Sequence, residues 1–507
     1  MNARFTDLLR AEWTKFRTVR AWMIALCAAA VVFVVLSFLS AFESHYAEPS
    51  VPTGPGGEAV SDTYMFVHQA LAGDGTLTAR VTTLAGAYAA APSNTGPSAF
   101  GAFAKGGPSA QLRPGLAPWA KAGIIIEPDT RQGTAYAAVM VTGSHGVQMQ
   151  YDYIHDSQGL GGSVGPSSPR WLRITRAGDV ITGFDSADGR HWAEIGIARV
   201  PGLPRTVQIG LFVTSPEDFA AGGGSGNGTP SVATASFDQI SAHGDLPRRS
   251  WIPDAITGSG YYPYQPPARA WQERSPTAFT ISGSGDIAPL VGDILSPQWA
   301  GASIVNGTIV ALLFVIVLAT VFATAEYRRG LIRSTFTASP RRGRVLAAKA
   351  VVAGSLAFVA AAIATAIAEV VTRHVLAANG SYLFPQSWPD LVRAIIGTGL
   401  FLGLAAALAV ALGMMLRRSA LAIAAGIVLL VLPGIIGSES GNWLMRFTPT
   451  AAFAIQATLP RSSLVTSAYT PPNGYFPVSS WAGLAVLAAY TAVALAAALC
   501  VLRRRDA

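Results

Sequence analysis

Long uncharged stretches alternate along this chain with segments that are rich in polar residues. At 1.5 Å per residue, a helix of about 20 apolar residues spans the hydrocarbon core of a bilayer, which is roughly 30 Å thick. We therefore predict six transmembrane helices. The apolar runs that predict them lie at residues 21–42, 301–325, 351–372, 391–416, 419–437 and 480–502.

In the segment before the first apolar run, apolar residues recur with a helical period. Leu8, Leu9, Trp13 and Phe16 recur at helical spacing, and Glu12 and basic residues are expected to fill the other faces. This pattern predicts an interfacial amphipathic helix over residues 1–20. The apolar run that follows is longer than the core of a secretory signal peptide, so we expect it to be retained as a transmembrane helix.

Residues 43–298 follow a different pattern. Long apolar runs disappear, Gly, Pro, Ser and Thr become frequent, and short alternating stretches such as WLRIT from 171 and VQIGLFV from 207 recur. Strands at this spacing, separated by turn residues, are typical of an antiparallel sandwich. We predict a large all-β sandwich between the first two transmembrane helices, with a Pro-rich connection over residues 245–298 leading into the helices of residues 299–507.

The distribution of charge predicts the orientation in the membrane. The chain is 51% hydrophobic, only 13% of it is charged, and its net charge is +8. Of its 36 basic residues, 17 lie in short segments beside apolar runs, seven of them in the loop 326–349. Basic loops stay in the cytoplasm, so we expect this loop and both termini to be cytoplasmic, and the sandwich to lie outside the plasma membrane. Because the charge follows the membrane boundaries, we expect no nucleic-acid partner.

Within the loop, Tyr327, Leu331, Ile332 and Phe336 fall near one face of a short helix that ends before Pro340. On the other side of the membrane, residues 438–479 contain NWLMRFTPTAAFAIQATLP, an apolar stretch too short to span. We expect an outer re-entrant or interfacial helix there.

Two features of the apolar runs have more than one interpretation. Glu369 lies in the third run, where an ionisable residue suggests a proton or substrate site, but Arg373 follows one turn later and favours an ion pair. Gly399 and Gly403 form a GxxxG pattern in the fourth run, and we expect it to serve packing within the chain rather than a dimer.

Few residues in the chain suggest catalysis. No Gly-Lys dipeptide occurs, so a Walker phosphate loop is excluded, and the two cysteines lie in apolar runs. Glu127 and Asp129 resemble half of the carboxylate set of jelly-roll glycosidases, but Arg131 stands where a third acid would follow. We therefore expect no enzyme, no metal and no cofactor in this chain. Three tryptophans of the sandwich are candidates for stacking on sugars or for ordinary core positions: Trp119, Trp171 and Trp192.

Parts of the chain resemble two known families. EYRRGLIRSTFTASPRRGRVLAAKA, from Glu326, and LLRAEWTKFRTVRAW, from Leu8, resemble the coupling loop and the N-terminal helix of type 2 ABC transporter permeases of actinobacterial character. Residues 64–242 are similar to concanavalin-like jelly-roll domains. The first resemblance implies a separate ATPase subunit that binds ATP-Mg, a second permease half, identical or different, and a coupling loop that docks the ATPase. The docking residues it implies are Tyr327, Arg328, Arg329, Arg333 and Phe336.

The pattern and the resemblances together predict the membrane-spanning permease subunit of an ATP-driven ABC exporter. Two alternatives remain open: a membrane-anchored extracellular module that binds glycan or envelope polymer, and a mechanotransmitting ABC subunit that moves no substrate. Drug, lipid, peptide and polysaccharide all remain possible as substrates.

Overall fold

The chain divides into a helical unit, formed by Met1–Pro49, Gly223–Asn227 and Leu295–Ala507, and a β unit, formed by Ser50–Gly222 and Gly228–Ile294. The computed structural model describes residues 5–42, 52–89, 112–218, 229–246, 250–257, 271–290, 300–328, 341–379, 383–384, 386–440, 443–458, 476 and 478–504.

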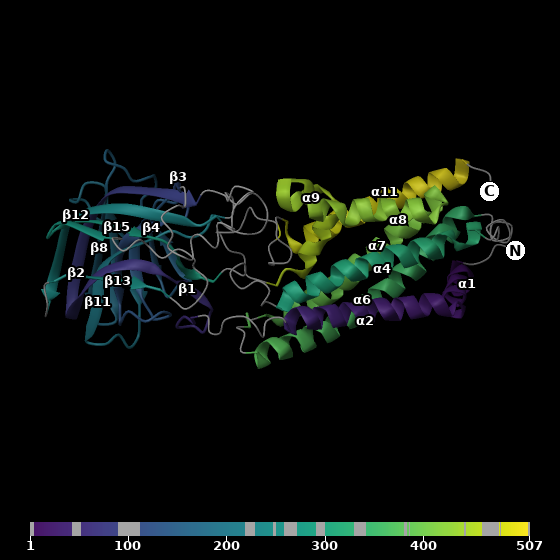
Figure 1. Ribbon diagram of the computed structural model, residues 1–507, viewed down its shortest axis with the longest axis horizontal. Coiled ribbons are helices and arrows are strands. Elements are labelled where there is room, and N and C mark those ends of the chain that lie inside the picture. The colour runs from purple at the N-terminus through teal and green to yellow at the C-terminus, as the bar shows by residue number, and fades with distance from the viewer. Residues whose placement is uncertain are drawn as a thin grey trace. The chain divides into compact units, whose positions relative to one another are not determined.

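Long apolar helices lie side by side in the helical unit, and α1 lies across one end of them (Figure 1). Within the described residues, six helical stretches are long and apolar enough to cross a membrane, as the sequence pattern predicted. These features are those of a multi-pass membrane protein. The helices are α1 (Phe5–Thr18), α2 (Arg20–Phe42), α4 (Ala300–Arg328), α6 (Arg342–Ala378), α7 (Trp388–Leu416), α8 (Ser419–Leu430), α9 (Leu432–Ser440), α10 (Trp443–Phe447), η2 (Pro449–Gln456) and α11 (Ser480–Arg504).

Helix α7 forms the centre of this unit. Of its apolar span 72% is buried, against 22% for α2 and for α11. Small residues let it approach α6 closely, because a Cβ atom at Gly403 would lie 2.9 Å from the carbonyl oxygen of Gly354, and one at Gly399 would lie 2.9 Å from the ring of Phe358. Both glycines of the GxxxG pattern therefore pack against α6 of the same chain, as expected.

After α8 the chain forms short elements instead of another full-length helix. Helix α9 begins just after Val431, α10 spans five residues, and η2 is a 3-10 helix whose eight residues are all buried against α7 and α11. These elements lie in the stretch where the sequence predicts a re-entrant segment. Its depth in a bilayer stays a prediction, and residues 459–475 lie outside the described part.

The β unit is built around one very long strand, β2 (Tyr64–Ala89). Strand β2 pairs with β11 through residues 65–72, with β8 through residues 75–81, and with β12 through residues 72–88. The other strands are β1 (Val60–Asp62), β3 (Leu112–Pro114), β4 (Lys121–Glu127), β5 (Ala137–Thr142), β6 (Val147–Tyr151), β7 (His155–Gln158), β8 (Arg170–Ala177), β9 (Val180–Ser186), β10 (Ala193–Arg199), β11 (Thr206–Thr214), β12 (Ser231–Asp245), β13 (Ile252–Ile256), β14 (Trp271–Ser275), β15 (Ala278–Gly283) and β16 (Ile287–Pro289).

All of the strand pairings are antiparallel, and the main path of the large sheet runs β10-β9-β8-β2-β11-β4-β5-β6-β7. The sheet folds back on itself, so that β4 and β5 pack across a core from β8 and β9. Alternate residues such as Leu77, Ala79 and Val81 on β2 fill this core, while Thr76 and Thr78 lie on the opposite face. The predicted combination of a helical membrane part and a large antiparallel β part is confirmed.

Candidate functional site

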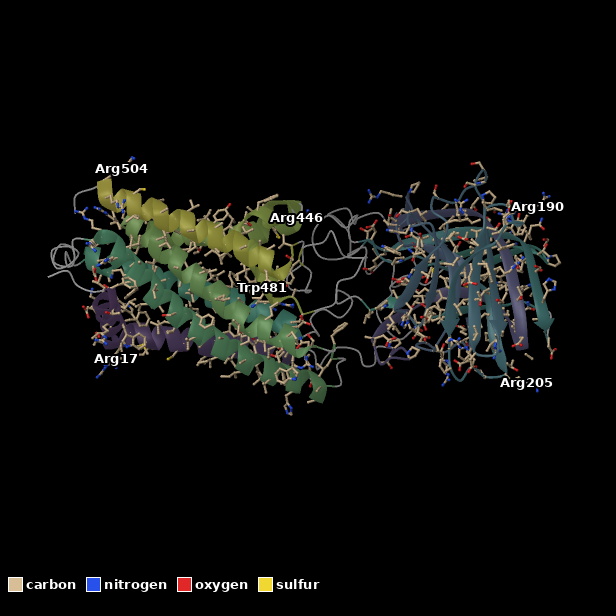
Figure 2. The ribbon with its side chains drawn as sticks, turned by 180° about the vertical axis from the view of Figure 1, so that it is seen from behind. Arg17, Arg190, Arg205, Arg446, Trp481 and Arg504 are labelled. Carbon is tan, nitrogen blue, oxygen red and sulfur yellow. The ribbon has the colours of Figure 1, made fainter. Side chains whose placement is uncertain are left out.

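Aromatic side chains attach α1 to the end of the helical unit. The ring of Phe16 lies 5.4 Å from that of Phe322 on α4 and 5.8 Å from that of Trp22, with the distances measured between ring centroids. Phe16 is only 2% exposed, whereas Arg17 next to it is exposed and points away from the bundle (Figure 2). Helix α1 is therefore amphipathic, as predicted, and its apolar face packs on the bundle.

Four charged side chains meet behind these aromatic rings, and we call them the charge cluster: Glu12, Lys15, Glu326 and Lys349. Lys349 Nζ lies 2.8 Å from Glu12 Oε2 and 3.0 Å from Glu326 Oε1. Lys15 Nζ lies 2.7 Å from Glu12 Oε1 and 2.7 Å from Glu326 Oε1. Each ammonium thus binds both carboxylates, and the formal charges cancel.

The cluster is buried at its centre. The side chains of Glu12 and Lys349 are 2% and 1% exposed, and the Lys349 ammonium lies 4.9 Å from the ring centroid of Phe322. Lys15 lies at the edge, 40% exposed. Burial opposes the charge on Lys15, but hydrogen bonds to Glu12 and Glu326 outweigh this effect and raise its pKa. Removal of one of the four groups would leave the cluster with an unbalanced buried charge, which is unfavourable.

The charge cluster joins three elements that are distant in the sequence. Glu12 and Lys15 belong to α1, Glu326 to the last turn of α4, and Lys349 to the second turn of α6. The segment between α4 and α6 is the basic loop with its predicted docking helix. The cluster therefore fixes α1 to both ends of that loop.

The structure describes only some of the predicted docking residues. Arg328 is the last residue of α4, and Tyr327 before it is half-buried, with its ring centroid 5.4 Å from the guanidinium carbon of Arg417. Tyr327 therefore contacts a neighbouring helix end as well as the start of the loop. Arg329, Arg333 and Phe336 lie outside the described residues.

Sequence reasoning missed the charge cluster as a site. Lys349 counted only as one of seven basic residues that set the topology, and Glu326 only as the single acid among them. One signal was available: Glu12 falls four residues before Phe16 and four after Leu8, on the buried face of α1. A carboxylate on an apolar face requires a partner in the folded protein.

The expected ion pair between Glu369 and Arg373 is not formed. Arg373 Nη1 instead donates to Gln386 Oε1, at 2.9 Å, in the connection to α7. Glu369 is 3% exposed, and its Oε2 atom has no hydrogen-bond partner among the described residues. Residues four apart on a helix lie close to the same face, so the spacing permits the pair, but Arg373 reaches toward the connection to α7 instead.

A neutral polar group lies near the middle of the bundle. Gln456 Nε2 of η2 donates to Thr308 Oγ1 of α4, at 2.7 Å, and to Thr398 Oγ1 of α7, at 2.9 Å. All three side chains are at most 2% exposed. These bonds hold the short 3-10 helix against two long helices and satisfy the amide nitrogen of Gln456, whereas its Oε1 atom has no hydrogen-bond partner among the described residues.

In the β unit, the three candidate tryptophans separate into two places. Trp171 on β8 and Trp192, just before β10, line one open cleft of about 510 Å³. Trp119 lies outside this cleft, stacked on His145 at a centroid distance of 3.8 Å. The structure thus brings together two of the three residues predicted to stack on sugars.

The two acids that resemble half of a glycosidase set are not arranged for hydrolysis. Glu127 is 2% exposed and accepts a hydrogen bond from Tyr64 Oη at 2.5 Å, and burial raises the pKa of its carboxyl well above the ordinary value. Asp129 is paired with Arg131 at 2.7 Å. Within the described part of the chain, no three His, Cys, Asp or Glu side chains are grouped to hold a metal ion.

No protein-family model and no curated protein matches the chain. Among solved structures, it is similar to a functionally unknown protein from Saccharomyces cerevisiae, at 16% identity and a TM-score of 0.21 over 35% of this chain and 74% of that one. It is also similar to scytalido-glutamic peptidase with a transition state analog inhibitor, at 10% identity and a TM-score of 0.26 over 45% of this chain and 100% of that one. Both likenesses are too weak to indicate a function.

Proposed function

We propose that this chain is the membrane-spanning subunit of an ATP-driven exporter, and that a separate ATPase docks on α1 and on the loop between α4 and α6. The observation that supports this function best is the charge cluster. It joins the exposed amphipathic helix to both ends of the basic loop. A partner that moves α1 or the loop would therefore move the ends of α4 and α6 with it.

The basic residues support an orientation in the membrane. Arg17 and Arg504 lie at one end of the helical unit, and Arg446 and Trp481 lie toward the other (Figure 2). By the positive-inside bias, the end with the charge cluster faces the cytoplasm, where ATP is available. In this proposal the β unit is a jelly-roll domain outside the plasma membrane, because it lies between one outward and one inward crossing.

The packing of the helical unit suggests where a transport path would lie. A hollow between α2, α4, α6 and α7 has a volume of about 20 Å³ and is lined by Leu26, Phe33 and other apolar side chains. It has room for about one water molecule and offers no polar partner for it. A substrate would therefore pass between two such subunits rather than through this hollow, and ATP-driven movement of the two subunits would switch the path between the two sides.

A pull-down from the native membrane tests the docking surface. The chain is extracted in mild detergent, and co-purifying proteins are searched for an ATPase with a Walker motif. We expect the unchanged chain to retain such an ATPase, and the variant Arg328→Glu/Arg333→Glu to lose it. The matched control is Arg503→Glu/Arg504→Glu, which reverses the same number of charges at the C-terminal end of α11 and should retain the partner.

Comparison of the two variants distinguishes a docking role of the loop arginines from a role in membrane topology alone. Loss of the ATPase from both variants would mean that the arginines act only through orientation or lipid contact, and would remove the support for this docking surface. If repeated extractions of the unchanged chain recover no ATPase, the exporter proposal is wrong. The membrane-anchored binding module then becomes the better proposal, since the cleft in the β unit favours it.

A further inference from the structure

The open cleft of the β unit lies on the face of the sheet that is turned away from the main core. Residues on β8, β2 and β12 alternate between the two faces, so Leu172 and Ile174 enter the core while Trp171, Arg173 and Thr175 do not. Arg173 is opposite Thr78, and Thr78 is opposite Ser241, in register across the three strands. Residues of three neighbouring strands, β8, β2 and β12, therefore line the cleft together.

Arg173 is the charged group at the centre of this cleft. Its Nε donates to Thr78 Oγ1 at 3.1 Å, and its guanidinium carbon lies 3.8 Å from the ring centroid of Trp192. Among the described residues no carboxylate pairs with it, and burial lowers its pKa. The neighbouring Arg80 differs, because it forms two hydrogen bonds with Asp238, at 2.7 Å and 2.6 Å. Arg173 is thus a positioned cation that has a hydrogen bond and a ring contact but no carboxylate partner among the described residues.

The turn between β9 and β10 holds the two tryptophans in place. Gly189 has φ +74 and lies so close to Trp171 that a Cβ atom there would be 2.6 Å from the indole ring. Asp188 in the same turn accepts hydrogen bonds from the backbone nitrogens of Arg190 and His191 and lies 2.7 Å from His191 Nδ1. Asp188, next to Gly189, is therefore engaged within the turn, as Asp238, next to Gln239, is engaged by Arg80, and there is no Asp or Glu among the described residues that line the cleft.

The opposite wall of the cleft carries a strained residue. Gln239 of β12 has φ +50, a left-handed conformation that is uncommon outside glycine, and the pairing of β12 with β2 is irregular between Asp238 and Ser241. Bulges and strained residues are concentrated at binding sites, where they aim side chains. Gln239 and Ser241 both line the cleft.

We infer that this cleft binds a saccharide chain that carries a carboxylate or phosphate group, with Arg173 on the anion and Trp171 and Trp192 against the sugar rings. Indole rings pack on the apolar faces of sugars, and the hydroxyls of Thr76, Thr78 and Ser241 match sugar hydroxyls. The size of the cleft suits about two or three sugar rings. This inference does not depend on the exporter proposal.

Pairs of probes, each pair with the same sugar rings but only one member charged, test the inference with the full-length chain in detergent. Binding of hexagalacturonate is compared with binding of its methyl-esterified form, which has the same rings without the charge, by tryptophan fluorescence and calorimetry. A second pair, 6-phosphorylated and unphosphorylated mannopentaose, tests phosphate. We expect at least one anionic probe to bind about tenfold or more tightly than its neutral counterpart, because hydrogen bonds between charged groups are the stronger ones. The pair that shows the preference identifies the anion.

Variants locate the effect at the cleft. Arg173→Gln should abolish the preference for the anionic probe, and Arg173→Lys should restore part of it. Trp192→Ala should weaken the binding of both members of a pair. The matched controls are Arg113→Gln, an exposed arginine of β3 that pairs with Tyr88, ten residues along β2 from Thr78, and Trp119→Ala, a tryptophan outside the cleft, and both should bind as the unchanged chain does. Thermal unfolding of each variant checks that it is folded.

Two results would overturn the inference. One is that neither anionic probe binds more tightly than its neutral counterpart. The other is that Arg113→Gln lowers the affinity as much as Arg173→Gln does, since the attraction would then belong to the general charge of the surface and not to the cleft.

Discussion

Replacing Lys349 with methionine should release α1 from the helical unit. Methionine has a similar length but no charge, so Lys349→Met leaves the buried carboxylate of Glu12 with Lys15 as its remaining partner. Removing one partner from a buried ion pair costs about 3–5 kcal/mol. Because Lys15 still contacts both carboxylates, we expect the lower end of that range, about 3 kcal/mol, for the docking of α1.

Hydrogen–deuterium exchange of the backbone amides of α1 measures this effect in the full-length chain in lipid nanodiscs. At 1.36 kcal/mol for each factor of ten, the expected loss corresponds to roughly a hundredfold faster exchange in α1. Amides in the buried helix α7 should keep their rates. Lys15→Met is the matched control, and it should have a smaller effect, because Lys15 is 40% exposed and water already screens its charge.

A double variant tests whether charge is the cause. Glu12→Gln/Lys349→Met restores the balance of the cluster, with one ammonium and one carboxylate remaining, and should regain part of the lost protection. The reasoning is refuted if Lys349→Met leaves the exchange of α1 unchanged. It is refuted equally if Lys15→Met has the larger effect, because the buried lysine would then not hold the helix.

Two further predictions concern packing and pH. A Cβ atom at Gly403 would meet the backbone oxygen of Gly354, whereas one at Gly343 would meet only the flexible end of Leu499. Gly403→Ala should therefore lower thermal stability by about 1–3 kcal/mol, and Gly343→Ala by less. In the β unit, burial raises the pKa of Asp62 to about 6 despite hydrogen bonds from Tyr153 and Gly133. Since the unfolded pKa is lower, protonation favours the folded state, and raising the pH from about 4 to about 6 should destabilise the β unit by about 2 kcal/mol. Asp62→Asn should reduce this dependence in unfolding curves measured at both pH values; an unchanged slope would contradict the assignment to Asp62.

The elements of this fold could be predicted because two sequence patterns are strong: the long uncharged runs, and the alternation of apolar and polar residues. Uncharged runs of about 20 residues have one stable form in a membrane, a helix, so six of them were found from hydropathy alone. Alternation likewise identified strands such as β8 and β11. The extent of β2 was less visible, because its 26 residues include Gly73 and Gly75, which look like a turn in sequence. Pairing with β11, β8 and β12 keeps the strand continuous there.

The contacts of single charged residues could not be predicted in the same way. Spacing alone paired Glu369 with Arg373, but a helix turns by about 100° per residue, and the direction of each side chain depends on which neighbours surround it. Arg373 binds Gln386, thirteen residues later. Trp171 and Trp192 are 21 positions apart in sequence and reach one cleft only because the turn after β9 brings Trp192 back over β8.

The charge cluster shows that basic residues near the loop act in two different ways. An arginine that acts through the positive-inside bias favours the cytoplasmic side by its charge alone, so another arginine nearby could replace it. Lys349 has the same charge but is 1% exposed, so its position is fixed by Glu12 and Glu326 and not by the membrane. Residues of the first kind act by their number, and residues of the second kind act by their contacts. A force applied to α1 would therefore be transmitted to α4 and α6 through Lys349 and its two carboxylates, together with Lys15 and the contact of Phe16 with Phe322.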